Sequence, residues 1–310
     1  MKSLVTGGAG FIGSNLVDAL LARGDEVTVL DDLSTGRRVN LDGALENGAR
    51  LAEVDVRDAA AVAATFAEAR PELVFHLAAQ IDVRRSVTEP AFDAAVNVGG
   101  TANVLEAARA SGVGRVIFIS TGGALYGEGA DKQLPLPEST PIAPLSGYGQ
   151  SKYAAEGYLG LYERLHGLSG MSLRLGNVYG PRQDPLGEAG VVAIFCGLLD
   201  SGGTPTVYGD GTQTRDYIYV GDVVSAALAA GATRLGGAVN IGTGREASVL
   251  DLVDILAGLA GRDDFKPEFA RPRAGEVQRI SLDAGMAERE LDWAPETTLE
   301  QGLKLTLDAV

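Results

Sequence analysis

Cysteine and histidine are almost absent from this chain of 310 residues. Cys196 is the only cysteine, and His76 and His166 are the only histidines. A single cysteine excludes an internal disulfide and a cysteine-ligated metal centre, and two histidines are too few for a histidine-rich one. We therefore expect no metal site in this protein.

The chain also lacks long apolar runs and an excess of basic residues. It has no stretch of 18 or more apolar residues, and its first residues, MKSLVTGG, do not have the pattern of a signal peptide. The formal net charge of −15 argues against nucleic acid or an anionic membrane surface as the main partner. We expect a cytoplasmic globular protein that binds neither nucleic acid nor a membrane.

Short apolar runs alternate with longer helical patterns through the first 175 residues. The pattern predicts strands at 3–6, 26–31, 49–55, 72–78, 115–120 and 171–176, and helices at roughly 11–23, 59–69, 91–111 and 147–167. Apolar runs that are each followed by a helix indicate strands buried on both faces. The sequence therefore predicts an α/β fold with a doubly wound parallel sheet of the Rossmann type.

The pattern is looser after residue 176. Segments 177–190 and 209–217 are rich in glycine, proline and polar residues and read as loops, 238–244 reads as one more strand, and helices are expected near 248–260, 283–291 and 298–308. We predict a Rossmann domain of residues 1–176 plus about 213–243. The remainder, about 177–212 and 244–310, would form a smaller lobe that binds the substrate.

A glycine-rich turn follows the first predicted strand and opens the first predicted helix. The stretch TGGAGFIG (6–13) fits G-x-G-x-x-G, and Asp31 follows about 20 positions later, at the end of the second strand. Such a turn lets the backbone approach a pyrophosphate at the positive end of a helix dipole. Asp31 can accept hydrogen bonds from ribose hydroxyls and would repel a 2′-phosphate, which favours NAD over NADP.

Tyr148 and Lys152 lie four residues apart in YGQSKYAAE (148–156). On a helix they share a face, with Cβ atoms about 5–6 Å apart. A fixed ammonium group near a phenol favours the phenolate and lowers its pKa, so the pair could act as a general acid and base. A solvated helix face is the alternative, because this spacing is common by chance.

These features together resemble the extended short-chain dehydrogenase/reductase family, and most of all its UDP-sugar 4-epimerases of the UDP-galactose 4-epimerase type. The resemblance runs nearly end to end, through VTGGAGFIGSNLV (5–17), DDLSTG (31–36), HLAAQ (76–80), NVGGT (97–101), YGQSK (148–152), RLGNVYGPRQ (174–183), GDGTQTRDYIYVGD (209–222) and NIGTG (240–244). It implies an NAD-dependent enzyme that acts on a UDP-sugar.

The resemblance also implies which residues bind the cofactor. They are Gly7, Gly10, Phe11, Ile12 and Gly13 at the pyrophosphate, Asp31, Asp32, Leu33, Ser34, Thr35 and Gly36 at the adenosine ribose, Asp55 and Val56 at the adenine, and Leu77, Ala78, Ala79, Gln80, Asn97, Tyr148 and Lys152 toward the nicotinamide.

For the third catalytic residue we select Thr121 in ISTGGALYG (119–127), with Ser120 as the fallback. The substrate residues that the resemblance implies are Arg84, Thr121, Tyr148, Asn177, Val191, Tyr208, Arg215, Arg273 and Glu276. Arginines suit the diphosphate because a planar guanidinium pairs bidentately with phosphate oxygens. Family members often dimerise through two helices per subunit, so we expect a homodimer through helices 91–111 and 147–167.

The expected reaction is inversion at C4 of a UDP-hexose, by default UDP-glucose and UDP-galactose, through a transient 4-keto sugar. UDP-glucuronate is the nearest alternative, with Arg84, Arg85 or Arg182 reading its carboxylate, whereas Ile280 disfavours N-acetylated sugars. A dehydratase or reductase is less expected, because Gly122 and Gly123 stand where dehydratases of the family place an Asp-Glu pair. A non-catalytic protein would usually have lost the tyrosine or the lysine.

Overall fold

The main sheet has seven strands, all parallel, among the residues that the computed structural model describes, 1–129, 131–185, 190–273 and 277–310. Its spatial order is β11-β6-β5-β4-β1-β2-β3. The strands are β1 (Lys2–Thr6), β2 (Glu26–Asp31), β3 (Arg50–Glu53), β4 (Leu73–His76), β5 (Arg115–Thr121), β6 (Ser169–Leu175) and β11 (Ala238–Ile241). This order confirms the predicted doubly wound α/β fold.

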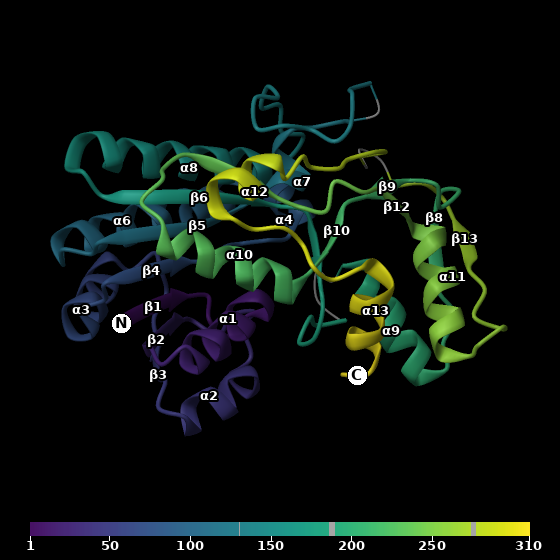
Figure 1. Cartoon of the computed structure of the whole chain (residues 1–310), viewed down its shortest axis with the longest axis horizontal. Coiled ribbons are helices and arrows are strands. Elements are labelled where there is room, and N and C mark those ends of the chain that lie inside the picture. Colours follow the sequence, from purple (N-terminus) through teal and green to yellow (C-terminus); the bar gives the residue numbers. More distant parts are fainter. Residues whose placement is uncertain (130, 186–189, 274–276) are drawn as a thin grey trace.

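Helices cover both faces of this sheet (Figure 1). On one face, the buried side chains of the sheet pack against those of α3 (Ala59–Ala69), α6 (Gly100–Ala110) and α8 (Gly147–His166). On the other face they pack against α1 (Phe11–Ala22), α10 (Val220–Ala232) and α12 (Gly285–Leu291), with η1 (Arg38–Leu41) and α2 (Asp42–Glu46) at the edge. The central strands are mostly apolar because both of their faces are covered, and the polar residues in them, such as His76 and Arg174, are buried.

A second group of elements lies at the right of Figure 1, around its own hydrophobic cluster. It contains α9 (Val191–Ser201), α11 (Val249–Ala260), α13 (Leu299–Leu307) and the paired strands β8 (Thr206–Tyr208) and β13 (Glu268–Ala270). Two further short pairs are β7 (Asn177–Tyr179) with β10 (Tyr217–Tyr219), and β9 (Thr214–Arg215) with β12 (Ala247–Ser248). Helix α12 belongs to the predicted smaller lobe but packs on the main sheet. The domain boundaries therefore remain a prediction.

Several elements differ from those expected. The helix predicted over 91–111 is divided into α5 (Pro90–Ala94), a π-helical turn η2 (Ala95–Gly99) and α6. Strands β7 and β9 lie in segments predicted as loops, and α4 (Val83–Thr88), α7 (Gly122–Leu125), α9 and α10 were not predicted. Helix α9, VVAIFCGLLDS, is apolar on nearly all sides, so its sequence has no clear helical period.

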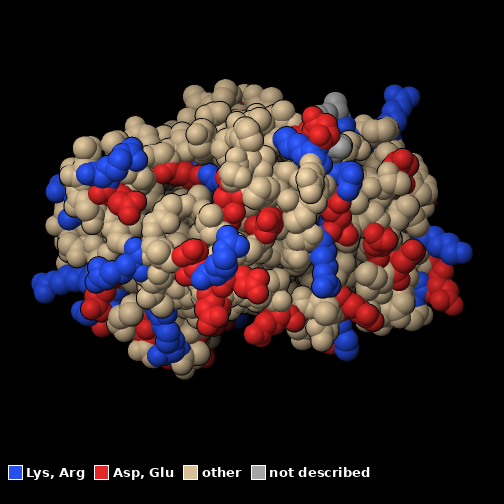
Figure 2. All heavy atoms as spheres, turned by 45° about the horizontal axis from the view of Figure 1, so that its top comes forward, with Lys and Arg blue, Asp and Glu red and all other residues tan. Residues whose placement is uncertain are grey.

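The surface mixes charges of both signs. In Figure 2, basic and acidic side chains are interspersed across the face shown, without a continuous basic area. Within the described ranges, no helix combines the length and the apolarity that crossing a membrane requires.

Candidate active site

The predicted cofactor residues follow strands β1, β2 and β4, which end at one edge of the sheet. Strand β1 pairs with β2 on one side and with β4 on the other, so the direction of the strand order reverses at β1. In open α/β sheets, ligands bind outside the carboxyl ends of the strands at this switch point. The sheet therefore brings the glycine turn, Asp31 and the segment after His76 to one place.

The glycine turn packs too closely for larger residues. Gly7 has a φ of +69°, and a Cβ there would lie 2.6 Å from the backbone nitrogen of Ala78. A Cβ on Gly13 would lie 2.1 Å from the carbonyl oxygen of Gly7. Helix α1 begins after Gly10, and no side chain caps it. The N–H groups of its first turn can therefore receive an anion such as the NAD pyrophosphate.

Asp31 is buried next to this turn. Its two carboxylate oxygens each accept one backbone hydrogen bond, Oδ2 from Ala9 and Oδ1 from Leu33, both at 2.9 Å. A Cβ on Gly36 would lie 2.8 Å from Asp31 Oδ1, so glycine keeps the space beside the carboxylate open. Burial raises the pKa of Asp31, and its remaining lone pairs suit the ribose hydroxyls of NAD. Asp32 instead accepts a hydrogen bond from the Ser34 hydroxyl.

The adenine-side residues have protein partners of their own. The Asp55 carboxylate accepts hydrogen bonds from the Arg57 guanidinium, with Nε at 2.8 Å and 3.0 Å, and this lowers the pKa of Asp55. Val56 is buried and leaves room only for glycine at Gly100, where a Cβ would lie 2.6 Å from Val56 Cγ2. Contact of Asp55 and Val56 with adenine stays a prediction.

The Thr6 hydroxyl holds the backbone of the loop after β4, which leads toward the nicotinamide end. The N–H groups of Leu77 and Ala78 both donate to Thr6 Oγ1 at 3.2 Å. Thr6 Oγ1 is also 2.6 Å from Nδ1 of His76, whose Nε2 lies 2.9 Å from Thr101 Oγ1. Burial, with a smaller contribution from a nearby cation, lowers the pKa of His76 to about 3. His76 is therefore neutral and structural. Thr35 lies in the loop after β2 and Ala79 in the loop after β4, beside the other predicted cofactor residues.

Thr121, Tyr148 and Lys152 meet at the end of β5. Ser146 caps α8 by accepting a hydrogen bond from the Gly149 N–H at 3.1 Å, which sets Tyr148 in the first helical turn. The Thr121 side chain lies close enough to the Tyr148 phenol to lower its pKa. Lys152 Nζ donates to the carbonyl oxygen of Ile119, also on β5, at 2.8 Å. The strand therefore holds both helix residues.

The pKa of Tyr148 differs from the sequence-based expectation. Burial raises it to about 12, the hydrogen bond from Thr121 lowers it and the charge of Asp93 raises it, while Lys152 is not among the groups that shift it. Burial lowers the pKa of Lys152 itself to about 8. The expectation that the Lys152 ammonium lowers the Tyr148 pKa is wrong for the chain alone, because the ammonium is directed at Ile119 and desolvation dominates.

Ser120, the alternative to Thr121, is directed elsewhere. Its hydroxyl donates to Glu156 Oε1 at 2.6 Å, and Glu156 forms a buried ion pair with Arg174 at 2.7 Å. Neighbouring residues of a strand face opposite sides. The geometry therefore favours Thr121 as the partner of Tyr148.

The segment behind the pair contains a carboxylate that was not predicted. Asn97 and Gln80, both predicted cofactor residues, share the Oδ1 atom of Asp93 as an acceptor. Asp93 lies four residues before Asn97, on the same side of the helical segment, and this spacing was the available signal.

The predicted substrate residues fall into two groups. Asn177 begins β7, and a Cβ on Gly123 would lie 3.4 Å from Asn177 Oδ1 and 4.0 Å from Thr121 Oγ1, so Asn177 borders the catalytic hydroxyl. The Arg273 guanidinium lies 3.9 Å above the centre of the Tyr208 ring. Those two residues line a cavity of about 350 Å³, together with Gly209, Asp210, Gln213, Pro272 and Gln278.

The remaining predicted substrate residues are more scattered. Arg215 lies on β9, Val191 begins α9, and Arg84 is exposed on α4. Glu276 lies outside the described residues. These positions bring Asn177 to the catalytic residues and Arg273 to Tyr208, but they do not by themselves assemble one complete binding site.

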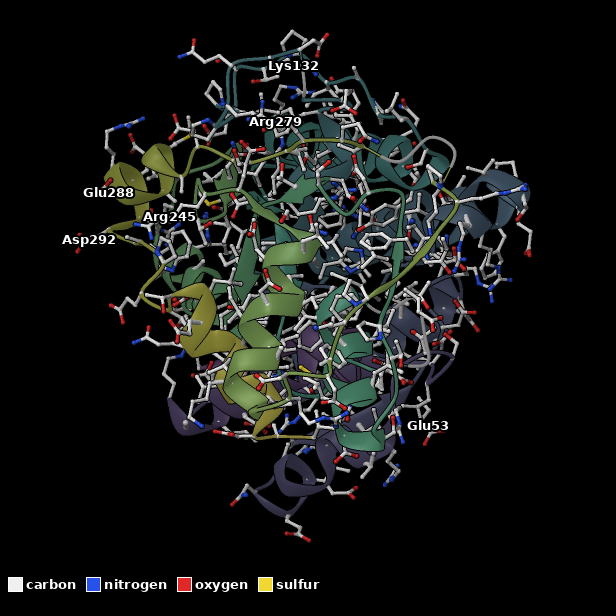
Figure 3. The ribbon with its side chains drawn as sticks, turned by 90° about the vertical axis from the view of Figure 1, so that its right-hand side faces the viewer. Glu53, Lys132, Arg245, Arg279, Glu288 and Asp292 are labelled. Carbon is white, nitrogen blue, oxygen red and sulfur yellow. The ribbon has the colours of Figure 1, made fainter. Side chains whose placement is uncertain are left out.

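Two segments, one after β5 and one near the C-terminus, meet at the end of α7. The Glu128 carboxylate accepts hydrogen bonds from the backbone N–H groups of Gln278 at 2.7 Å and Arg279 at 3.1 Å. Lys132 Nζ donates to the Tyr126 carbonyl at 2.6 Å. Figure 3 shows Lys132 and Arg279 in the upper part of the molecule, where these two segments meet. The contacts join the segment after β5 to the C-terminal segment.

Three positions bear on the alternatives. Arg182 forms an ion pair with Asp18 at 2.6 Å, and Arg85 pairs with Glu89 at 3.0 Å, so both guanidinium groups already have carboxylate partners. A Cβ on Gly122 would lie 2.4 Å from Leu282 Cδ1, so a side chain there would require Leu282 to move. Ile280 is buried in a cluster with Tyr126, Leu136 and Leu282.

The sequence pattern of the NAD dependent epimerase/dehydratase family matches residues 3–242. The chain is 48% identical to a UDP-glucose 4-epimerase of Mycolicibacterium smegmatis, over 99% of this chain and 98% of that protein. It superimposes with a TM-score of 0.96 on a UDP-glucose 4-epimerase of Thermotoga maritima crystallised with UDP-glucose, at 46% identity, covering 100% of this chain and 98% of the other.

A UDP-glucose 4-epimerase of Thermus thermophilus in complex with NAD gives a TM-score of 0.91 at 44% identity, covering 100% of this chain and 98% of the other. The glycine turn, the buried Asp31 and the residues at the end of β5 agree with these matches. The chain belongs to the NAD-dependent epimerase/dehydratase family, within the extended short-chain dehydrogenases/reductases.

Proposed function

We propose that this enzyme is an NAD-dependent UDP-glucose 4-epimerase, which interconverts UDP-glucose and UDP-galactose through a transient 4-keto sugar. The observation that carries the proposal is the convergence of Thr121, Tyr148 and Lys152 at the end of β5, at the same sheet edge as the dinucleotide turn. The relatives described above, which are 44–48% identical over nearly the whole chain, bear the same name, whereas dehydratases that match over a similar length are 32–36% identical.

The residues at the end of β5 divide the proton chemistry between them. NAD, when bound, supplies the acceptor for the hydride from C4 and returns it. Tyr148, once ionised, would take the proton of the 4-hydroxyl and later give it back, and Thr121 would hold the same oxygen by a hydrogen bond. Because burial raises the pKa of Tyr148 in the chain alone, its ionisation would depend on the positive charge of the bound nicotinamide. Lys152, fixed by Ile119, keeps a cation beside this site and binds the nicotinamide ribose. Return of hydride to the opposite face of the sugar inverts C4 without net oxidation.

The two groups of predicted substrate residues described above would bind the diphosphate and the nucleotide. Asn177 borders Thr121, and Arg273 faces the cavity beside Tyr208, a position suited to the nucleotide end. Arg215 would pair with the diphosphate from β9, with Arg84 and Val191 near the sugar. These roles, and that of Glu276 at the uridine ribose, stay predictions.

The alternatives are less well supported. A UDP-glucuronate 4-epimerase needs a cation for the carboxylate. Arg85 and Arg182 are paired with Glu89 and Asp18, which leaves Arg84 as the candidate for that role. A dehydratase of this family needs an acidic pair after Thr121, and a side chain at Gly122 would require Leu282 to move. A non-catalytic protein would not need the arrangement of Thr121 with Tyr148. The homodimer and the cytoplasmic location also stay predictions.

The test compares three substrates by NMR. The protein is incubated with UDP-glucose, UDP-glucuronate or UDP-N-acetylglucosamine, with and without added NAD. We expect the C4 epimer of UDP-glucose without net NADH, and a loss of at least about 100-fold in rate for Tyr148→Phe, since a general base contributes at least that much. Loss of water, net NADH, or a Tyr148→Phe variant as fast as wild type would contradict the proposal.

A further inference from the structure

Asp93 is a buried carboxylate whose donors are amides. It lies on α5 and is 2% exposed. Its Oδ1 atom accepts hydrogen bonds from Gln80 Nε2 at 3.0 Å and from Asn97 Nδ2 at 3.1 Å. Burial of a charge is costly unless the charge is paired, and two neutral amides compensate it only in part. A buried carboxylate that is only partly compensated, so close to the proposed catalytic residues, is expected to have a function there.

The hydrogen bonds of Asp93 lead directly to the catalytic helix. Asn97 Oδ1 accepts from the Gln80 N–H at 2.8 Å, and Asn97 Nδ2 also lies 3.0 Å from Ser151 Oγ on α8. Ser151 in turn donates to the Tyr148 carbonyl at 3.0 Å. The carboxylate is therefore connected, through one amide and one hydroxyl, to the helical turn that carries Tyr148 and Lys152.

We propose that Asp93 is a positioning residue of the Tyr148–Lys152 pair, which holds Gln80 and Asn97 in place and supplies a fixed negative charge behind the two catalytic groups. Only the expected effect of Asp93 on turnover rests on the proposed function. The charge keeps Lys152 protonated in a buried site and disfavours early ionisation of Tyr148, so it sets the pH range in which both groups have the required protonation states. In agreement, the Asp93 charge raises the pKa of Lys152, which burial lowers. It also raises the pKa of Tyr148, which burial raises as well.

Other charged groups around α8 have different partners. Glu156, on the same helix, also raises the pKa of Lys152, but it forms an ion pair with Arg174 of β6. His76 on β4 is neutral. On the adjoining α4, the charged side chains are Arg84 and Arg85, of which Arg85 pairs with Glu89. Asp93 is thus distinguished by amide partners and by its effect on both catalytic groups.

The first experiment follows Lys152 directly and needs no substrate. The chain has lysine only at Lys2, Lys132, Lys152, Lys266 and Lys304, so the ε-carbon resonances of ¹³C-lysine-labelled protein can be assigned with single Lys→Arg variants. For Asp93→Asn we expect the Lys152 titration midpoint to fall by about one pH unit, the effect of one nearby opposite charge. Asp93→Glu, which keeps the charge, should restore most of it. Glu89→Gln, which removes an exposed carboxylate on the neighbouring turn, should leave it unchanged.

The second experiment follows turnover of UDP-glucose against pH. Because Asp93→Asn lowers the pKa of both catalytic groups, both limbs of the rate profile should move to lower pH. A uniform loss of rate without movement would show a merely structural role and would overturn the proposal, as would an unchanged Lys152 midpoint. If UDP-glucose is not converted but the Lys152 midpoint still moves, the inference on Asp93 stands and the proposed function fails.

The unmodified protein provides a test that does not depend on the variant folding. The carboxyl ¹³C shift of Asp93 at neutral pH must be that of an ionised carboxylate. A shift typical of the neutral acid would mean that no fixed charge stands behind the pair, and the proposal would be overturned.

Discussion

At the scale of single residues, Thr121 and Ser120 have different surroundings although they are neighbours. The Thr121 side chain lies beside the Tyr148 phenol and lowers its pKa, whereas the Ser120 hydroxyl donates to Glu156. We expect Thr121→Val to lower kcat for the C4 epimerisation about 100-fold, the effect of losing one hydrogen-bond donor at a reacting oxygen. Thr121→Ser should recover most of the loss.

Ser120→Ala is the matched control, because it removes a hydroxyl one residue away. It should leave kcat within a few fold and instead lower stability, since Glu156 loses a donor. Steady-state kinetics with UDP-glucose and urea unfolding separate the two effects. A larger loss of kcat in Ser120→Ala than in Thr121→Val would refute the assignment of Thr121.

The sequence could predict Tyr148 and Lys152, because their spacing places them on one helix face whatever lies around them. It could not predict the pKa of Tyr148, because that depends on how far the fold removes the hydroxyl from water. It also could not choose between Ser120 and Thr121 from spacing, because the choice depends on which residue of α8 each hydroxyl meets, and Ser120 meets Glu156. Asp93 was missed because its four-residue spacing from Asn97 is common on exposed helix faces, and only the fold shows that it is buried.

At the scale of elements, Asp216 ties the strand segment that carries Arg215 to the C-terminal half. Its carboxylate accepts hydrogen bonds from Thr243 N at 2.8 Å and Oγ1 at 2.6 Å, and from the N–H groups of Gly244 and Leu282, each at 3.0 Å. Asp216→Asn replaces an acceptor oxygen by a donor. We expect the free energy of unfolding to fall by about 2 kcal/mol, since buried donors lose their acceptor.

Urea unfolding followed by circular dichroism measures this change, and KM for UDP-glucose should rise because Arg215 is displaced. Asp210→Asn serves as the control for stability alone, because Asp210 is exposed and accepts from Thr212, but it lines the cavity beside Arg273. If both variants lose the same stability, the network around Asp216 is not what joins these segments.

The elements themselves were predictable where their pattern was strong. Buried strands followed by amphipathic helices gave the Rossmann order, and glycine after β1 gave the turn. The short strands β7, β9 and β10 could not be predicted, because backbone pairing with distant segments forms them and their own sequence is polar or aromatic. The π-helical turn interrupts a segment that reads as one helix, and it places Asn97 so that its amide meets Gln80, Asp93 and Ser151.

At the scale of the whole molecule, one face of the sheet layer exposes aromatic side chains. Helix α8 packs beside α6 on that face, and Tyr153, Tyr158 and Leu165 on α8 are exposed by 44%, 39% and 65%. Tyrosine is enriched at protein interfaces because it combines apolar area with a polar end. These residues lie on α8, one of the two helical segments through which family resemblance predicts a homodimer.

We therefore expect a dimer in sedimentation velocity, and we expect Tyr158→Glu to weaken it roughly 30-fold, the effect of about 2 kcal/mol at an interface anchor. Leu235→Glu is the matched control, because Leu235 is 41% exposed but lies in the loop after α10, outside α6 and α8. Circular dichroism must show both variants folded. A wild-type monomer, or equal dissociation by both variants, would contradict the predicted interface, because a charge buried between two α8 helices is costly whereas one in that loop remains in water.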